Sequence, residues 1–315
     1  MVAIGTWNVE NLFSTGEFAP TALGVFEAKV EGIAALVEST NLDVAGLQEV
    51  GDDAAFTALL TRLGPAWSGI ASSFPDSRGI RVAVVSRLPI IATEDVAELA
   101  PGLTPTQLDD DGRVATRMGR GLLRVRVQAP NGPVDVVTCH LKSKLISYPN
   151  GRFWPHNEGE RARFAAYAIY RRAAEATTLR EYANAILDGN GETQKLVVLG
   201  DLNDEPAAAT TQIVQGPPGS EIGTPGALMP DKGDAWRLLN LAPKLPADQQ
   251  STRVFRGRGE LIDHIFISRA LLPIVTGVTI TAPGPLPSID EAAKTRQNKP
   301  ISDHAMLVAT LALAA

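Results

Sequence analysis

Short apolar runs alternate with clusters of turn residues along nearly the whole chain. Most of these runs are rich in Val and Ile and are bounded by Gly, Pro, Asp or Asn, which is the pattern of β-strands. The pattern therefore predicts strands over residues 2–9, 42–50, 79–86, 122–127, 134–141, 195–199, 260–268, 274–281 and 305–313.

Helical periodicity occurs in fewer places. Apolar residues recur three or four positions apart over residues 23–37, which predicts an amphipathic helix. Asp52 and Asp53 can cap a second helix with apolar residues over 56–63. The longest helix is predicted from about residue 158 to 187, with a break near its middle left open. Many short strands with helices packed outside them indicate an α/β or α+β sandwich.

Two segments rich in Pro, Gly and Asp, residues 101–120 and 216–234, predict long loops. We expect both to be surface connections, with a substrate rim as the alternative, because long loops in compact domains are often functional. Candidate chemical residues lie on both sides of each loop, which argues against a domain linker. We therefore predict a single domain over residues 1–315.

The composition is that of an ordinary globular protein. Of 315 residues, 44% are hydrophobic and 20% are charged, which excludes a disordered, collagenous or coiled-coil chain. The single cysteine, Cys139, excludes an intramolecular disulfide and a cysteine-based zinc site. We find neither a signal-peptide pattern nor a run of about 18 apolar residues, so we expect a cytoplasmic protein without a membrane span. Because the net charge is −6, any polyanion has to be bound by a local positive patch.

Candidate chemistry is concentrated at the ends of predicted strands. In four segments polar residues end an apolar run, and in the last two they begin one. If the last two strands run antiparallel to the first four, all six segments meet at one edge of the fold. The segments are TWN at 6–8, LQE at 47–49, CHLKS at 139–143, GDLN at 200–203, IDH at 262–264 and SDH at 302–304.

The side chains gathered in this way form a coherent set of oxygen and imidazole groups. Oxygen-rich ligation selects a hard cation such as Mg²⁺ or Mn²⁺, and zinc is disfavoured because no close pair of His or Cys ligands is evident. A hard cation beside imidazoles and amides suits the hydrolysis of a phosphoester. The candidate residues are the carboxylates Glu49, Asp201 and Asp303, the amides Asn8 and Asn203, and the imidazoles His140 and His304.

In these six segments, from Gly5 to His304, the chain resembles the endonuclease/exonuclease/phosphatase superfamily. That superfamily includes DNase-type nucleases, sphingomyelinases and inositol polyphosphate phosphatases. Each motif alone is weak evidence, whereas all six in the family's order are highly specific. The resemblance implies a four-layered α/β sandwich of two mainly antiparallel sheets flanked by helices, in agreement with the strand pattern.

The resemblance also implies a role for each motif residue. Glu49 matches the metal-binding glutamate of the family, Asn8 the asparagine that helps to hold metal or phosphate, and Asp303 a metal ligand or a residue just behind the ligands. Asp201 matches the aspartate that orients or deprotonates the attacking water, and Asn203 the asparagine that grips the phosphate.

The two imidazoles are expected at the phosphate. His304 matches the histidine that touches the scissile phosphate, and Asp263 the aspartate that pairs with it and favours its charged form. His140 matches a histidine of the DNase and sphingomyelinase branches. His264 and Cys139 neighbour motif residues on strands, so we expect their side chains on the opposite face as structural residues.

Two cations are weaker candidates for binding the substrate phosphate. Lys142 shares the strand face of His140 if the chain stays extended, with a solvated strand end as the alternative. Arg81 begins a predicted strand, with an exposed strand arginine as the alternative. The aromatic residues Phe153 and Trp154 follow in a polar loop, where we expect packing rather than ligand stacking.

The sequence thus predicts a Mg²⁺- or Mn²⁺-dependent phosphoester hydrolase, in which water attacks phosphorus without a covalent enzyme intermediate. The HLKS segment favours a phosphodiesterase or nuclease. The net acidity makes a small phosphodiester or a single-stranded oligonucleotide as acceptable as duplex DNA. The alternatives are a phosphomonoesterase acting on a small metabolite or lipid headgroup, and a non-catalytic binding module on the same fold. No membrane and no obligate protein partner are implied.

Overall fold

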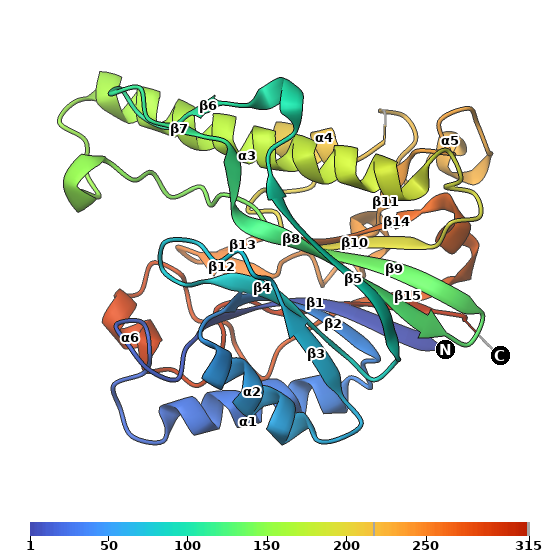
Figure 1. Cartoon of the computed structure of the whole chain (residues 1–315), viewed down its shortest axis with the longest axis horizontal. Coiled ribbons are helices and arrows are strands. Elements are labelled where there is room, and N and C mark those ends of the chain that lie inside the picture. The colour runs from blue at the N-terminus through green and yellow to red at the C-terminus, as the bar shows by residue number, and fades with distance from the viewer. Residues whose placement is uncertain (217, 314–315) are drawn as a thin grey trace.

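Two six-stranded β-sheets lie face to face at the centre of the computed structural model, and helices cover their outer faces (Figure 1). The structure describes residues 1–216 and 218–313. The first sheet has the order β15-β16-β1-β2-β4-β3. Its strands are β1 (Val2–Leu12), β2 (Val44–Val50), β3 (Ser68–Ala71), β4 (Arg81–Ser86), β15 (Val275–Thr281) and β16 (Met306–Leu311).

The second sheet has the order β11-β14-β10-β9-β8-β5, and two short hairpins lie outside both sheets. The sheet consists of β5 (Ile90–Glu98), β8 (Arg117–Ala129), β9 (Gly132–His140), β10 (Leu196–Asp201), β11 (Leu238–Asn240) and β14 (Asp263–Ser268). The hairpins are β6 (Thr106–Gln107) with β7 (Val114–Ala115), and β12 (Arg253–Phe255) with β13 (Arg258–Glu260).

Helices α1 and α2 pack on the first sheet and α3 and α4 on the second, so the molecule has four layers (Figure 1). Neighbouring strands are antiparallel apart from the pairs β1–β2 and β9–β10, as predicted for a mainly antiparallel sandwich. The α-helices are α1 (Val25–Ser39), α2 (Asp53–Leu63), α3 (Glu158–Leu187), α4 (Ala209–Val214), α5 (Pro225–Leu228) and α6 (Ala293–Gln297); 3₁₀ turns span Pro101–Leu103, Pro149–Gly151, Ala242–Lys244 and Arg269–Ile274.

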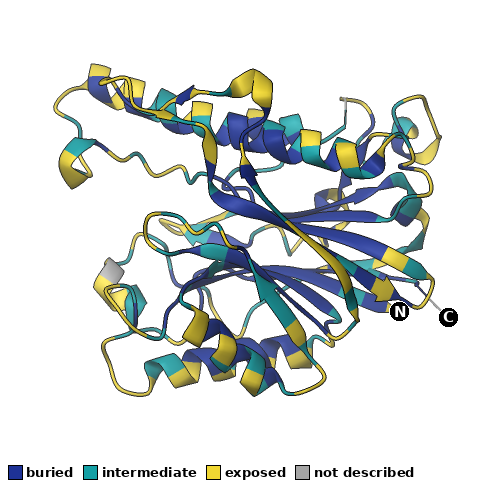
Figure 2. Ribbon diagram, viewed as in Figure 1, coloured by how far each residue is buried: buried dark blue, intermediate teal, exposed yellow. Residues whose placement is uncertain are grey.

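The hydrophobic core is divided into clusters that lie between adjacent layers. One apolar cluster fills the space between the two sheets, a second lies between the first sheet and α1–α2, and a third lies under α3. Figure 2 shows buried residues along both sheets and exposed residues on the outer faces of the helices. Each sheet is therefore buried on both faces, which explains why most strands are continuous apolar runs rather than alternating ones.

The sheets approach closely where β2 crosses β9 and β10. A Cβ atom on Gly46 would lie 2.2 Å from Leu199 Cδ1, so this position requires glycine. Beside it, Thr6 Oγ1 donates to Gln48 Oε1 at 3.2 Å and Gln48 Nε2 donates to Thr138 Oγ1 at 3.0 Å. This buried polar chain links β1 and β2 of the first sheet to β9 of the second and aligns the two layers.

The helix starts agree with the capping signals. The Asp52 side chain accepts from Ala55 N at the start of α2, and Asn157 accepts from Glu160 N at the start of α3. Helix α3 is continuous over its 30 residues, so the break that the sequence left open near its middle is absent.

The predicted loop over 101–120 is wrong in part, because this segment contains a 3₁₀ turn, the β6–β7 hairpin and the start of β8. The loop over 216–234 contains the short helix α5, and its Pro217 lies outside the described residues. Among the residues that the structure describes, no helix is long and apolar enough to cross a membrane.

Candidate active site

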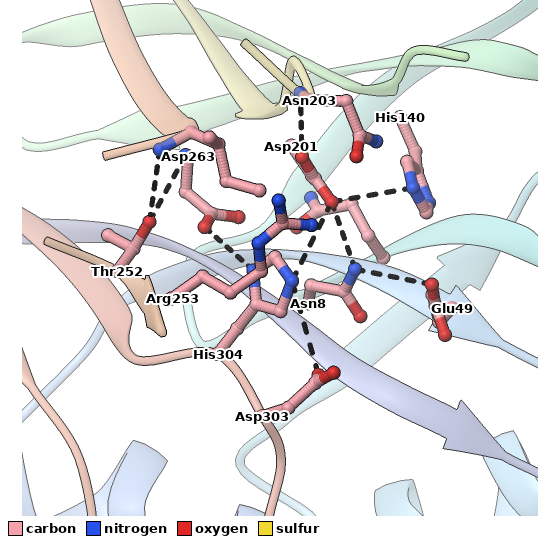
Figure 3. Close-up of polar contacts among 12 residues, drawn as sticks. Asn8, Glu49, His140, Asp201, Asn203, Thr252, Arg253, Asp263, Asp303 and His304 are labelled. Carbon is pink, nitrogen blue, oxygen red and sulfur yellow. Dashed lines mark hydrogen bonds and ion pairs between the residues drawn. The ribbon is translucent and has the colours of Figure 1, made fainter. Parts of the chain in front are cut away.

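The six motif segments meet at one edge of the sandwich, where the two sheets face each other (Figure 3). β1 and β2 run parallel and end at this edge, as do β9 and β10. β14 runs antiparallel to β10 and β16 antiparallel to β1, so their starts lie at the same edge. The predicted antiparallel arrangement of the last two strands is therefore confirmed.

Asp201 lies at the centre of the cluster and is buried. Its Oδ2 accepts from Asn8 Nδ2 at 3.1 Å and faces His140 Nε2 at 3.4 Å, while its Oδ1 accepts from Asn203 N at 2.8 Å. Burial and then the charge of Asp263 raise the pKa of Asp201 from 3.8 to about 6, although His304 opposes this shift. A carboxyl group with this pKa can accept a proton near neutral pH.

His304 is held against Asp263. Its Nδ1 lies 2.8 Å from Asp263 Oδ2, and its Nε2 lies 4.0 Å from Asp201 Oδ2. Burial alone would lower the pKa of His304, but the charge and hydrogen bond of Asp263 raise it to about 10. The ring is therefore an imidazolium at neutral pH, with both nitrogens protonated. Its Nε2–H faces the side of the centre that Asp201 occupies.

His140 has the opposite protonation state. Burial and then the positive charge of Arg120 lower its pKa well below the ordinary value, so this ring is neutral at pH 7. Its Nδ1 is buried without a hydrogen-bond partner among the described residues. Two imidazoles thus flank Asp201, one charged and one neutral, because only His304 has a carboxylate at its Nδ1.

Glu49 and Asn8 lie side by side at the end of the β1–β2 pair. Asn8 Nδ2 is 3.4 Å from Glu49 Oε1, and Asn11 N donates to Glu49 Oε2 at 3.1 Å. The pairing register of β1 and β2 shifts after Asn8, and Glu49 has a φ of 60°. The strand pairing is thus interrupted at Glu49, which changes the direction of its side chain relative to a regular strand.

Hydrogen bonds between side chains and the backbone fix the SDH segment on β1. Ser302 Oγ donates to Asn8 O at 2.6 Å and accepts from His304 N at 3.0 Å. Trp7 Nε1 donates to His304 O at 2.8 Å. The serine and the tryptophan of the motifs are thus positioning residues that hold His304 in place.

Asp303 belongs to an ionic cluster that the sequence did not reveal. Arg296 Nη1 donates to Asp303 Oδ2 at 2.8 Å and to Glu10 Oε1 at 3.0 Å, and Asp303 N donates to Glu10 Oε2 at 3.1 Å. Lys29 Nζ donates to the carbonyl of Glu10. Burial and then the charge of Asp303 raise the pKa of Glu10 to about 7. A glutamate two positions after Asn8 was the only signal available, since Lys29 and Arg296 lie in no motif.

Arg253 is a second residue that sequence reasoning missed. It begins β12 and forms an isolated antiparallel bridge with His304, so its backbone lies beside the candidate site. The neighbouring Thr252 accepts from Asp263 N at 3.3 Å through its Oγ1. Figure 3 shows the Arg253 side chain among the polar groups of the candidate site.

The two candidate phosphate-binding cations, Lys142 and Arg81, form hydrogen bonds or ion pairs with residues outside the site. Lys142 Nζ donates to the carbonyls of Ser143 and Leu145 at 3.0 and 2.8 Å, because β9 ends at His140 and the chain does not stay extended. Arg81 Nη1 forms an ion pair of 3.0 Å with Asp53. Neither cation bonds a residue of the centre among the described part of the chain.

The two residues expected on the opposite strand face are placed there. His264 is buried between Asn240 Nδ2 and the carbonyl of Asp204, at 3.2 and 2.8 Å. Cys139 is fully buried, and burial raises the pKa of its thiol. Phe153 and Trp154 differ from expectation, because their 69% and 65% exposure leaves them mostly unpacked.

One group of side chains could hold a metal ion by distance alone. Among the described residues, Asp201, Asp263 and His304 offer ligand atoms that all lie within 4.8 Å of one another. However, Asp263 and His304 already bond each other. Glu49 is only half-buried, and each of its carboxylate oxygens accepts one hydrogen bond, from Asn8 Nδ2 at 3.4 Å and from Asn11 N at 3.1 Å, so each oxygen keeps a free lone pair. The carboxylate and amide oxygens at this edge suit a hard divalent cation.

A model of the endonuclease/exonuclease/phosphatase family matches residues 5–304. No curated protein matches the chain. Among solved structures, TDP2 from C. elegans is similar at 15% identity and a TM-score of 0.57, over 98% of this chain and 74% of that one.

Two further structures cover nearly all of both chains. D. rerio TDP2 in complex with a single-strand DNA product is 16% identical with a TM-score of 0.58, over 98% of this chain and 97% of that one. The human Nocturnin catalytic domain with a bound sulfate anion is 18% identical with a TM-score of 0.56, over 98% and 93%. At these identities the similarity establishes the fold.

Proposed function

The chain belongs to the endonuclease/exonuclease/phosphatase family, whose members hydrolyse phosphoesters, and on this premise we propose that it is a divalent-metal-dependent phosphodiesterase. The observation that carries the proposal is the pairing of Asp201 with His304. One is a buried carboxyl group with a pKa of about 6, and the other is an imidazolium with a pKa of about 10. Between about pH 6 and 10 the site therefore holds a proton acceptor and a proton-bearing cation within 4.0 Å.

This pair suits in-line attack of water on a phosphate. Asp201 orients the water and takes up its proton, and His304 donates a hydrogen bond to an oxygen on which charge develops. Asn203 has one amide hydrogen bonded to the carbonyl of Leu141, at 3.0 Å, and keeps its second hydrogen for a phosphate oxygen. No residue of the centre is required as a nucleophile, so no covalent intermediate forms.

The residues fit a Mg²⁺ or Mn²⁺ ion at Glu49, with Asn8 and Asp303 nearby. When bound, such a cation polarises phosphoryl oxygens and lowers the pKa of coordinated water. We prefer Glu49 to the Asp201–Asp263–His304 group, because a protonated His304 has no lone pair to offer. The half-buried Glu49 carboxylate faces Asn8 Nδ2 only at 3.4 Å, which leaves its oxygens available.

The substrate class follows from fold and charge together. The related D. rerio TDP2 was solved with a single-strand DNA product, which supports a nucleic acid or another phosphodiester as substrate. A net charge of −6 opposes tight binding of duplex DNA, whose affinity depends on many cationic contacts. A small phosphodiester or a single-stranded oligonucleotide fits both observations.

A substrate panel tests the proposal. We expect hydrolysis of bis-p-nitrophenyl phosphate and of a single-stranded oligonucleotide with Mg²⁺ or Mn²⁺, slower hydrolysis of p-nitrophenyl phosphate, and none after addition of EDTA. Asp201→Asn serves as the control that separates the enzyme from a contaminating nuclease. Equal turnover by this variant, or turnover that survives EDTA, would refute the proposal.

A further inference from the structure

Arg253 occupies a position that no motif predicted, between the two segments that carry Asp263 and His304. Its bridge to His304 places it on one side, and Ala305 N donates to Thr252 O at 2.7 Å. On the other side Thr252 Oγ1 accepts from the backbone of Asp263. The backbone of the β12–β13 hairpin is thus joined to both members of the imidazolium pair.

The Arg253 side chain is prearranged rather than free in solvent. It is 8% exposed, and its Nε donates to Glu260 Oε2 at 3.2 Å. Its Nη2 donates to the same oxygen, and Arg253 and Glu260 face each other in the hairpin register. This two-point contact orients the planar guanidinium in a way that a single bond would not.

The remaining nitrogen, Nη1, has no hydrogen-bond partner among the residues that the structure describes. Figure 3 shows the guanidinium extending toward Asp201, and its charge acts on that carboxyl group. A buried guanidinium that is fixed on one side and has free N–H groups on the side of the catalytic carboxylate is an unfilled donor site for an anion.

Two other arginines near the centre make contacts of their own. Arg296 bonds Glu10 and Asp303, and Arg120 pairs with Asp76 and the carbonyls of residues 140 and 141. The positive charge of Arg253 lowers the pKa of Asp201, so its guanidinium lies near this carboxyl group.

On the basis of the proposed function, we propose that Arg253 binds a non-bridging oxygen of the substrate phosphate through Nη1, opposite His304. Glu260 acts as a positioning residue that holds the guanidinium in this orientation. Because negative charge builds on the phosphoryl oxygens during attack, a fixed guanidinium at this place stabilises the transition state as well as the bound ester. The subsite would accept the phosphate of any phosphodiester and does not depend on the leaving group.

Binding of inorganic phosphate, measured by titration calorimetry with saturating Mg²⁺, tests this subsite without requiring turnover. Arg253→Ala should weaken phosphate binding by about 10-fold or more, as expected for a lost charged hydrogen bond. Arg256→Ala is the matched control, because Arg256 is an exposed arginine on the same hairpin with no ion pair among the described residues. Its phosphate affinity and its kcat should stay within about twofold of the wild type.

Two further variants guard against misfolding, since Arg253→Ala removes the closer of the two cations that pair with Glu260, the other being Lys144 at 3.5 Å. The double variant Arg253→Gln/Glu260→Gln removes both charges, and Arg253→Lys keeps both charges but loses the planar guanidinium. If melting temperatures stay near the wild type, the double variant should lose phosphate affinity and kcat/KM by about 10-fold or more, and the lysine variant should lose less.

Each result decides between the two proposals. Unchanged phosphate affinity in a folded Arg253 variant, an equal loss in Arg256→Ala, or no phosphate binding by the wild type would overturn the subsite. Loss of phosphate binding in the Arg253 variants together with a wild type that hydrolyses no ester would support the subsite and refute the proposed function.

Discussion

Two buried aspartates at opposite ends of the same strand pair have opposite surroundings. Asp135 lies near the start of β9, opposite Leu196, and Asp201 ends β10, opposite His140. Each is 1% exposed. The same backbone arrangement therefore buries a carboxyl group at both ends, and only the neighbours differ.

Asp135 is fully neutralised. Its Oδ1 accepts from Arg124 and Arg126 at 2.8 and 3.0 Å, and its Oδ2 accepts from Arg126 and Gln194 at 2.8 and 2.6 Å. Asp201 has no Lys or Arg within 4.0 Å among the described residues and lies beside other carboxylates. A buried carboxylate whose oxygens are fully paired with cations and donors stabilises the fold, whereas a buried carboxylate with fewer donors can take part in proton transfer.

Asp201→Asn should have the largest effect, and it should act on activity alone. Loss of the proton acceptor should lower kcat about 10²–10⁴-fold. The raised pKa means that the ionised Asp201 works against the fold once the pH exceeds about 3.8, so the amide should leave the melting temperature unchanged or raise it at pH 7. Steady-state kinetics and calorimetric melting check both parts. A lowered melting temperature in Asp201→Asn would mean that Asp201, like Asp135, stabilises the fold.

Asp135→Asn is the matched change at the other end of the strands and should give the reverse pattern. Two arginines would lose their carboxylate, at a cost of about 1–3 kcal/mol in the free energy of unfolding. That figure is discounted from a fully buried pair because Arg124 and Arg126 are partly exposed. Urea unfolding measures the loss, and kcat per folded molecule should not change. A large fall in kcat would show that the two ends are coupled.

Glu49→Gln should weaken Mg²⁺ binding by at least about 10-fold while the fold survives, because the amide keeps the shape and removes the ligand charge. Titration calorimetry in the absence of substrate measures this directly. The matched carboxylate-to-amide change at the other end of the strands, Asp135→Asn, should leave the metal affinity as it is. If Mg²⁺ binds the Glu49 variant normally, the ion is held elsewhere.

Asp263→Asn should move a pH profile by one unit or more. Asp263 holds the pKa of His304 at about 10, so the imidazolium persists to alkaline pH. Without that charge the pKa falls, and the alkaline limb of kcat/KM should shift to lower pH. In a double-mutant cycle, adding Asp263→Asn to His304→Ala should cost little more. Strictly additive losses would mean that the two side chains act independently.

The sequence could predict the elements whose burial is uniform, and it failed where an element is polar or very short. The bounds of α3 agree with the predicted 158–187, because Asn157 supplies an N-cap and the segment contains no Pro and only one Gly. β5 was missed since it is an edge strand with mostly exposed residues, and β3 and β11 are only four and three residues long. Local patterns carry no signal for such strands, which depend on their neighbours in the sheet.

The same limit applies to the site. Asp201 and His304 were predictable because their types and places at strand ends form motifs. Arg296 and Glu10 are 286 positions apart and meet only in the folded chain. Arg253 lies on a hairpin of two three-residue strands, where an arginine looks like any surface residue. Contacts of this kind become visible only when the distances are known.

The catalytic centre straddles the two layers of the sandwich. Asn8 and Glu49 belong to the first sheet and His304 lies two residues before its strand β16, whereas His140, Asp201 and Asp263 belong to the second sheet. Enzyme activity therefore depends on the relative position of the two sheets, whereas far-ultraviolet circular dichroism reports only the secondary structure within each sheet. Gln48 forms hydrogen bonds with Thr6 and with Thr138, and these bonds hold the two sheets in register. A condition that shifts one sheet relative to the other should therefore abolish activity while the circular dichroism of both sheets stays unchanged.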